Sequence, residues 1–497
     1  MTRLACAGRV RGSTLDVPED EWVPEARRLQ REGWWFEGLW ATAGERPSVR
    51  ACWGRPGELL LATSACPEGT FRSFTSFLPA ADWFERAARD RSGLAPVGHV
   101  DPRAFLFHDT YPPGHVEGAP LDGDARAQRS SYAFVQHQGA GVFEIPVGPI
   151  HAGVIEPGHF RFTTTGELVL DLELRLNYTH KGTLTLVRGR RLDHAARLLE
   201  RLSGDNAAAH ALAFSSAAEA ALGLDVPNDV QDVRTAMLEA ERVYNHLGDL
   251  AGIATDVAFS AGASHFAALR EACMRWNARL FGHRLLMNTV VPGGLLQAPS
   301  VEAWSEYATA LDALTPRVES AVRLVTEHSG LRERVEGTGV LPRASAELLG
   351  CVGPAARACG IARDARADAP CLAYDRIRVT PSLRSGGDVA SRMAVKVDEL
   401  RASLGILRSI ARDAPIVGPA AAVVESGEGE GIAAVEASRG AVLAWTRVAD
   451  GRVVDAYQRD PSFLNWRGLQ QAVHRNIVPD FPLINKSFNL SYSGSDA

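Results

Sequence analysis

The chain has 497 residues, of which 46% are hydrophobic and 23% charged, and its formal net charge is -6. This length exceeds what one hydrophobic core usually serves, so we expect two or more domains, and the acidic balance argues against a surface that holds nucleic acid by bulk positive charge. The seven cysteines are scattered without a C-x-x-C pair, which indicates neither a disulfide framework nor a thiolate zinc site. No apolar run is long enough to span a membrane, and the N-terminus lacks the apolar segment of a signal peptide.

Residues 1–110 are predicted to form a small N-terminal α+β domain. They combine short apolar runs with the segment PAADWFERAARDRSG, in which Trp83 and Phe84 share one face of a helix. Residues 111–131 are rich in proline, glycine and charge, a composition typical of a linker. The remainder, residues 132–497, is predicted to be a second and larger domain.

The larger domain is predicted to begin with strands and to continue with helices. Strands are expected at residues 143–150 and 159–178, where apolar and polar residues largely alternate in the second segment. Residues 232–259 repeat apolar residues at three- and four-residue steps, as a long core helix does. Further helices are expected at residues 264–286, 301–327, 344–350 and 388–412, and a hairpin around Asp450 and Gly451. The predicted fold class is α+β, with a strand platform flanking a long helical bundle.

Several segments, taken in chain order, resemble subunits of respiratory assemblies. The segment FTSFLPAADWFERAARDRSGLAPVGHVDPRAFLFHD resembles the end of the small peripheral-arm subunit of respiratory complex I. Seven later segments resemble the large subunit that complex I shares with the membrane-bound nickel-iron hydrogenases, including that of formate hydrogenlyase. They are VGPIHAGVIEPGHFRF, LRLNYTHKG, LEAERVYNHLGDLAGIATDVAF, FGHRLLMNTVVPGG, CVGPAARACGIARDAR, GGDVASRM and EASRGAV. The fusion of both subunits in one chain is itself similar to formate hydrogenlyase.

The resemblance implies where a metal centre would lie. Such hydrogenases hold nickel and iron between two C-x-x-C pairs, because soft thiolates bind soft metal and bridge two metals at once. Matching ERLSGDNAAAH places Ser203 and Asn206 at the first pair, and matching SFNLSYSG places Ser491 and Gly494 at the second. A serine hydroxyl stays protonated near neutral pH, an amide is a hard neutral ligand, and glycine has no side chain. We therefore predict that the chain binds no metal directly and performs no hydrogen chemistry.

The same resemblance implies roles for polar residues around that position. Glu156 matches the position from which hydrogenases pass protons, and Arg439 matches the arginine over the metal. His210 stands in place of the histidine after the first pair, Asn489 replaces an aspartate before the second pair, and Tyr492 lies within the second pair. We predict that these residues line a rebuilt polar cavity. The alternative for Glu156 is an exposed carboxylate in a turn, and the alternative for Arg439 is a surface salt bridge. For the polar residues of the two loops, the alternative is a chance arrangement.

One predicted helix carries a row of polar residues. At near-helical steps along it lie Glu241, Asn245, His246, Asp249 and Asp256. A solvated face is the ordinary interpretation of such spacing. Because the resemblance places this helix inside a bundle, we predict an internal polar track that carries protons, with Asp256 as a catalytic candidate.

Two further patterns are interpreted as structural. His151, His159 and His180 lack a chelating spacing, and single histidines are more often hydrogen-bonded structural groups. The stretch GEGEGIAA does not follow the strand-turn-helix pattern of a dinucleotide site, so it is predicted to be a turn.

Quinone reduction, as in complex I, is a weaker interpretation. The complex I subunit presents a tyrosine at the first helix joint and a histidine on the first strand turn. Here the tyrosine position falls on Gly204 and the histidine position falls near Glu156 or Pro157. His151 matches only the preceding histidine of that turn, although Tyr492 could substitute from the other side of the cavity.

Together these features predict a nickel-free large subunit of a membrane-associated oxidoreductase related to complex I and formate hydrogenlyase, coupling electron transfer to proton or ion translocation. The resemblance implies an iron-sulfur small subunit that holds the cluster, and antiporter-like membrane subunits. The chain would then lie on the cytoplasmic, inner face of the plasma membrane through these partners. Two alternatives stay open: a quinone-reducing subunit of an NADH-dehydrogenase-like complex, and a non-catalytic scaffold that kept the fold after losing its metal.

Overall fold

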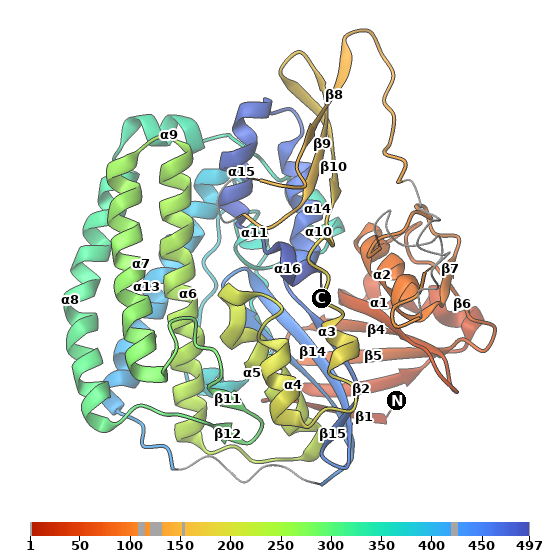
Figure 1. Cartoon of the computed structure of the whole chain (residues 1–497), viewed down its shortest axis with the longest axis horizontal. Coiled ribbons are helices and arrows are strands. Elements are labelled where there is room, and N and C mark those ends of the chain that lie inside the picture. The colour runs from red at the N-terminus through yellow and green to blue at the C-terminus, as the bar shows by residue number, and fades with distance from the viewer. Residues whose placement is uncertain (1, 108–114, 120–131, 152–154, 419–425, 497) are drawn as a thin grey trace.

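The computed structural model describes residues 2–107, 115–119, 132–151, 155–418 and 426–496. Figure 1 shows a bundle of long helices on one side, a large sheet that reaches the N-terminal region on the other, and a smaller sheet projecting beyond them. This mixture of helices and sheets confirms the predicted α+β fold class. Most of the expected linker lies outside the described residues, so the division of the chain at residue 110 stays a prediction.

An eight-stranded sheet joins the two ends of the chain. Its strand order is β15-β14-β13-β1-β2-β5-β4-β3. The strands are β1 Thr2–Cys6, β2 Arg11–Asp16, β3 Trp35–Thr42, β4 Ser48–Arg55, β5 Glu58–Ala65, β13 Gly429–Ala437, β14 Gly440–Ala449 and β15 Arg452–Arg459. Parallel pairing of β1 with β13, with Ala5 opposite Gly431, makes the N-terminal strands and the C-terminal hairpin one hydrogen-bonded layer. The expected hairpin turn is confirmed, and Asp450 and Gly451 both have positive φ, as a tight type I′ turn requires.

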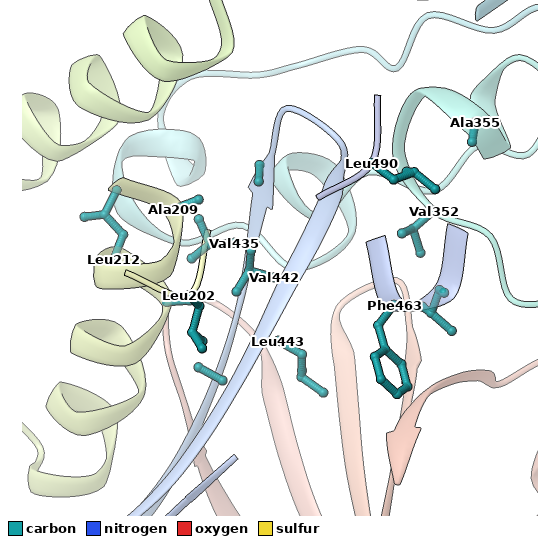
Figure 2. Close-up of a cluster of buried hydrophobic side chains, with 14 of the residues drawn as sticks. Leu202, Ala209, Leu212, Val352, Ala355, Val435, Val442, Leu443, Phe463 and Leu490 are labelled. Carbon is teal, nitrogen blue, oxygen red and sulfur yellow. The ribbon is translucent and has the colours of Figure 1, made fainter. Parts of the chain in front are cut away.

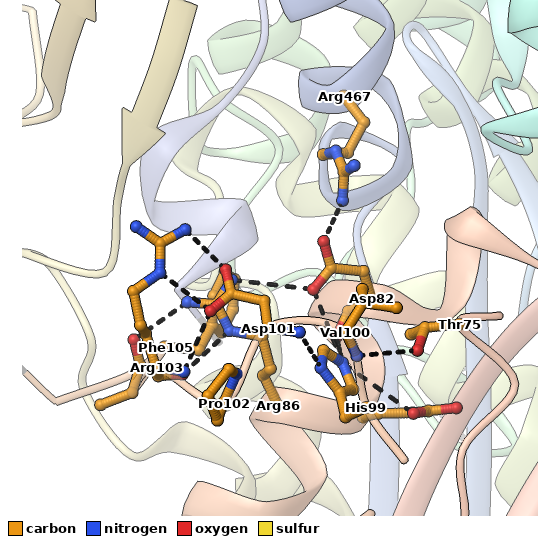
Figure 3. A network of polar contacts seen from close by, with 12 residues as sticks. Thr75, Asp82, Arg86, His99, Val100, Asp101, Pro102, Arg103, Phe105 and Arg467 are labelled. Atoms are coloured by element: carbon orange, nitrogen blue, oxygen red, sulfur yellow. Dashed lines mark hydrogen bonds and ion pairs between the residues drawn. The ribbon is translucent and has the colours of Figure 1, made fainter. Parts of the chain in front are cut away.

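Two helices and a short strand pair accompany the N-terminal strands. They are α1 Trp22–Arg31, α2 Asp82–Ser92, β6 Thr70–Arg72 and β7 Ala95–Val97. The expected helix over α2 is confirmed, and its Trp83 and Phe84 are buried. Figure 3 shows how α2 is tied to the rest of the chain: Asp82 pairs with Arg467 of α14, Ser462–Val473, in a network that also holds Arg86 and Asp101.

Four long helices form the bundle. They are α6 Asn228–Asp256, α7 Ser260–Phe281, α8 Val301–Thr326 and α13 Val389–Asp413. Helices α6 and α8 each pack against both α7 and α13, and all four lie side by side in Figure 1. The helices expected from three- and four-residue spacing are confirmed, although their ends differ by several residues. Within the described ranges, no helix combines the length and the apolar character that a bilayer crossing requires.

The strand platform is a three-stranded sheet in the order β10-β9-β8. Its strands are β8 Val142–Val147, β9 His159–Thr165 and β10 Leu168–Arg175. Strand structure is confirmed in both expected segments, and the segment 159–178 forms two antiparallel strands joined by a turn at Gly166. Phe160 and Phe162 of β9 pack on Phe481, with ring centroids 5.0 and 4.9 Å apart. The platform therefore rests on the C-terminal helix α15, Phe481–Phe488.

The helix α5, Ala207–Leu222, lies directly against strand β13. A Cβ on Gly431 would meet the carbonyl oxygen of Ala217 at 2.2 Å, and one on Gly429 would meet that of Ala221 at 1.9 Å. Only glycine allows so close an approach of helix and strand. The expectation of a turn over GEGEGIAA is therefore wrong, because the segment is strand from Gly429 onward and its glycines serve this contact.

The other α-helices and strands are shorter than the four bundle helices. They are α3 Thr183–Leu186, α4 Leu192–Leu199, α5 Ala207–Leu222, β11 Val290–Val291, β12 Gly294–Leu295, α9 Ser329–Val335, α10 Arg343–Leu348, α11 Gly353–Arg357, α12 Ala365–Asp368 and α16 Tyr492–Ser495. Around α5, β13 and β14, Figure 2 shows buried apolar side chains that include Leu202, Val435, Val442 and Leu490. Each contributes roughly 1.5–3 kcal/mol when buried. This apolar layer supports the loops that carry the candidate site.

Candidate functional site

The four positions matched to metal ligands lie together in the structure. Ser203 precedes the single helical turn that leads into α5, and Ser491 precedes α16. The hydroxyl oxygens of Ser203 and Ser491 are 2.8 Å apart, and Gly494 N donates to Ser491 Oγ at 3.0 Å. Asn206 lies at the other end of the same helical turn, and all four residues are buried. The space between the two loops is thus closed by direct hydrogen bonds.

Asp460, which no sequence motif singles out, fills the space beside Gly494. A Cβ on Gly494 would lie 2.7 Å from Asp460 Cγ. Asp460 Oδ2 lies 2.9 Å from His210 Nε2 and accepts from Asn206 Nδ2 at 3.4 Å. Burial would raise the pKa of Asp460, but the hydrogen bond from His210 and nearby positive charge hold it well below its usual range. Because Asp460 also accepts from Ser462 N at the start of α14, its local sequence is typical of a helix cap and gives no sign of this position.

Arg439 pairs with Asp205, a second residue that the sequence motifs do not single out. Arg439 Nη1 donates to Asp205 Oδ1 at 3.0 Å, Nη2 donates to Oδ2, and Nε donates to the carbonyl oxygen of Asn489. Burial would raise the pKa of Asp205, but the charge of Arg439 holds it below its usual range. Arg439 is buried, whereas the Asp205 side chain is 35% exposed. Asp205 is therefore the point where this group of residues reaches the surface.

We refer to these residues as the polar cluster: Ser203, Asp205, Asn206, His210, Arg439, Asp460, Ser491 and Gly494. Its members come from the α4–α5 connection and the start of α5, the β13–β14 turn, the residue after β15, and α16 with the residue before it. Segments far apart in the sequence thus meet at one place, where their polar side chains contact one another.

An ion pair continues from the polar cluster into the helical bundle. Asn489 Nδ2 donates to Asp249 Oδ1, and Asp249 Oδ2 accepts from Lys396 Nζ at 2.6 Å. On the same stretch of α6, His246 Nε2 lies 2.9 Å from Glu399 Oε2. Burial would raise the pKa of Asp249, but the Lys396 charge holds it well below its usual range. The two paired α6 side chains and their α13 partners are buried, so this part of α6 faces the interior of the bundle and not solvent.

Glu241, also on α6, caps the helix that follows the metal-ligand positions. Its carboxylate accepts from Ala208 N at 2.7 Å and Ala209 N at 3.0 Å, and Asn245 Nδ2 donates to Asp205 O at 2.7 Å. Burial raises the pKa of Glu241 to about 8. Helix α6 therefore fixes the N-terminus of α5 and the turn before it.

The turn of the strand platform contributes Glu156, which reaches α16. Glu156 Oε2 accepts from Ser493 N at 2.9 Å, one residue from Tyr492. The Tyr492 ring packs on Trp466 with centroids 4.9 Å apart, and burial raises its pKa to about 12. His151 Nε2 lies 2.7 Å from Gly158 O and so serves the backbone of its own turn.

The catalytic candidate Asp256 and two histidines interpreted as structural, His159 and His180, lie apart from the polar cluster. Asp256 is the last residue of α6 and is half-buried; burial raises its pKa while Lys486 opposes that shift. His159 Nδ1 lies 3.3 Å from Gly148 O, and His180 Nδ1 lies 2.7 Å from Asp496 O. The two histidines thus contact backbone oxygens, and Asp256 is separated from Asp249 by about two turns of helix.

The donors of the polar cluster do not suit a nickel-iron centre. The hydroxyls of Ser203 and Ser491 bond to each other, Gly494 offers no donor, and the Asp460 carboxylate fills the adjoining space. All seven cysteines lie elsewhere as free thiols. Across the part of the chain that the structure describes, no group of three or more His, Cys, Asp or Glu side chains is arranged to hold a metal ion.

Comparison with known proteins identifies the class. Residues 256–427 match the family described as respiratory-chain NADH dehydrogenase, 49 Kd subunit, and residues 53–131 match the 30 Kd subunit. The chain is 31% identical to hydrogenase-4 component G of Escherichia coli K12 over 86% of this chain and 76% of that protein. It is 30% identical to formate hydrogenlyase subunit 5 of the same organism, over 86% and 77%.

Wider comparisons agree with this class. The chain is 28% identical to an NADH-quinone oxidoreductase subunit of Dehalococcoides mccartyi strain 195, over 70% of this chain and 96% of that protein. A solved structure titled membrane-bound sulfane sulfur reductase, an archaeal respiratory membrane complex, shares the fold with a TM-score of 0.67 and 24% identity, over 72% of this chain and 99% of that one.

The fold and these matches define a large subunit of the type found in complex I and in membrane-bound hydrogenases. Within that class, the chain belongs to the family of hydrogenase-4 component G and formate hydrogenlyase subunit 5, and it joins 30 Kd-like and 49 Kd-like regions in one polypeptide. It is a subunit of a complex-I-like oxidoreductase.

Proposed function

We propose that this chain is a nickel-free large subunit of a membrane-associated oxidoreductase that couples electron transfer to proton or ion translocation. The observation that carries the proposal is the 2.8 Å hydrogen bond between Ser203 and Ser491, because it joins hydroxyls at two positions where the nickel enzymes place thiolates. Its partners are an iron-sulfur small subunit beside the polar cluster and antiporter-like membrane subunits. The chain is then peripheral, on the inner face of the plasma membrane.

In this proposal the polar cluster responds to a change of charge on a neighbouring group and does not react with hydrogen. Asp205 is its most exposed acid and pairs with the buried Arg439, so electrons that reach a neighbouring iron-sulfur cluster alter the field at this pair. Arg439 also donates to the Asn489 backbone, and the Asn489 side chain donates to Asp249. A charge change at Asp205 therefore has a continuous hydrogen-bonded route to the Asp249–Lys396 pair in the bundle.

Glu156 is the proposed proton-transferring group. Its carboxylate is half-buried and held by Ser493 N next to the polar cluster. In the complex purified with its partner subunits, Glu156→Gln should lower ion-coupled turnover at least about tenfold, because a positioned proton-transferring group contributes on the order of 10²–10⁴ in rate. Glu336→Gln, which removes an exposed carboxylate paired with Arg332, is the matched control and should leave turnover unchanged. Equal turnover in both variants would remove Glu156 from the mechanism.

A non-catalytic scaffold is the second candidate, favoured by the observation that the buried charges of the polar cluster pair with one another. The variant Asp205→Asn distinguishes a scaffold from a subunit that takes part in coupled turnover. In a working complex this variant should assemble and lose coupled turnover, because Arg439 loses its charged partner. In a scaffold it should assemble and keep full turnover. Subunit stoichiometry measured beside turnover distinguishes a loss of function from a loss of assembly.

A further inference from the structure

A pocket of about 500 Å³ lies between the N-terminal region and helix α10. On the N-terminal side it is lined by Trp34, Trp35 and Trp53, and on the opposite side by Arg343 and Glu347 of α10. Small-molecule sites have volumes of roughly 300–1,000 Å³ and are mostly apolar with a few polar groups. The pocket shares no lining residue with the polar cluster, so its role is independent of the proposed function.

The aromatic lining is held in place by neighbouring groups. Trp53 and Trp34 are only 1% and 8% exposed. The guanidinium of Arg55 lies 4.3 Å from the Trp34 ring centroid, and that of Arg363 lies 4.6 Å from the Trp35 centroid. Trp35 is the partly exposed one of the three tryptophans, so it is the ring that a ligand in the pocket can reach. An indole held in this way has little rotational freedom left to lose and packs best against another flat ring system.

The two arginines that line the pocket differ in how firmly they are held. The Arg363 side chain is only 11% exposed and bonds to Glu37. The Arg343 side chain is 63% exposed; its Nε donates to Glu347 Oε1 at 2.8 Å, four residues along the same helix, and its Nη1 donates to Gly360 O at 3.1 Å. Exposed pairs of this kind are weak, so an anion entering the pocket can replace Glu347 as the partner of Arg343.

We propose that this pocket binds a small, flat aromatic molecule that carries one anionic group. The rings lie against Trp35, and the carboxylate, sulfonate or phosphate pairs with Arg343. An unsubstituted aromatic molecule lacks the charged contact, and a simple inorganic anion lacks the apolar one. Both are therefore expected to bind more weakly than a molecule that has both features.

The test uses the full chain and 8-anilinonaphthalene-1-sulfonate, a flat aromatic anion whose binding is followed by its own fluorescence and by quenching of tryptophan. One saturable site per chain is expected. Arg343→Glu should weaken binding about tenfold or more, because it replaces a charge-assisted contact with repulsion. Arg332→Glu is the matched control, since Arg332 is 59% exposed and pairs with Glu336 at the same four-residue spacing on another helix; it should leave the affinity unchanged.

Two further measurements keep the result decisive. Ala362→Trp places an indole at the exposed edge of the pocket and should abolish the saturable site. N-phenyl-1-naphthylamine, which has the rings without the sulfonate, should bind more weakly and should not respond to Arg343→Gln, a variant that removes the charge without reversing it. Absence of saturable binding, equal loss in Arg343→Glu and Arg332→Glu, or unchanged binding in Ala362→Trp would overturn the proposal.

Discussion

The Asp460 carboxylate occupies the space that a side chain at position 494 would need. Because a Cβ on Gly494 would lie 2.7 Å from Asp460 Cγ and 2.9 Å from its Oδ2, Gly494→Cys should lower the free energy of unfolding by about 1–3 kcal/mol, the usual cost of overpacking. The double variant Gly494→Cys/Asp460→Ala should lose less than the sum of the two single variants, because the clash is removed with the carboxylate. Urea denaturation of all four proteins measures this difference. Additive losses would show that the two side chains do not compete for space.

We expect the ionisation of Glu85 to lower the free energy of unfolding as pH rises. Glu85 is fully buried, accepts from Phe74 N at 2.7 Å, and burial raises its pKa from 4.5 to about 8. Between these pH values the unfolded chain has lost the Glu85 proton and the folded chain retains it. The contribution of Glu85 to the free energy of unfolding is therefore fully present below about pH 4.5 and is lost as pH rises to about 8. The total change is on the order of 5 kcal/mol.

The variant Glu85→Gln isolates this effect, because its amide does not titrate. The difference in unfolding free energy between wild type and Glu85→Gln should shift in favour of the variant from pH 5 to pH 9. Glu241 and Asp496 also have raised pKa values and act in the same direction in both proteins, so they cancel. Parallel pH profiles for the two proteins would contradict the assignment.

The sequence placed some site residues and missed others for physical reasons. Ser203, Asn206, Ser491 and Gly494 were located by their resemblance to family motifs, and they lie together in the structure. Asp460 was missed because an aspartate before a proline and a serine is ordinary at a helix start. Its neighbours in space are distant in sequence, so no local pattern reports them.

At the scale of elements, the contact between α5 and β13 requires glycine. A Cβ on Gly431 would meet backbone atoms at 2.2 Å (Ala217 O) and 2.6 Å (Ala221 N), and backbone cannot move aside as a side chain can. Gly431→Ala should therefore cost about 3 kcal/mol or more of unfolding free energy. Gly405→Ala is the control: Gly405 is exposed in α13 with nothing within 4 Å of its added Cβ, so it should stabilise by about 0.5–1 kcal/mol. Equal effects in thermal unfolding would contradict this packing.

Long elements were predictable and their pairings were not. The bundle helices are indicated by apolar residues at three- and four-residue steps, and the platform strands by alternation. The glycines at the start of β13 were mistaken for a turn, because they admit α5, which lies far earlier in the chain. The pairing of β1 with β13 is equally remote, and strand neighbours so far apart leave no local trace.

For the whole molecule, the shared sheet means that the N-terminal and C-terminal regions support each other. The pairing of β1 with β13 and the Asp82–Arg467 ion pair both connect the N-terminal region to the C-terminal part of the chain. The proposed aromatic-anion pocket lies between the N-terminal region and α10. A ligand there would stabilise their contact, since any molecule that binds only the folded state raises its stability.

We propose that the converging loops hold hydrogen-bonded polar groups where nickel enzymes hold metal. The most direct test is the nickel content of the chain, purified with its partner subunits from cells that load nickel into a known nickel-iron hydrogenase prepared in parallel. We expect trace nickel in this complex and a full complement in the hydrogenase. One nickel atom retained per chain after extensive washing would contradict it.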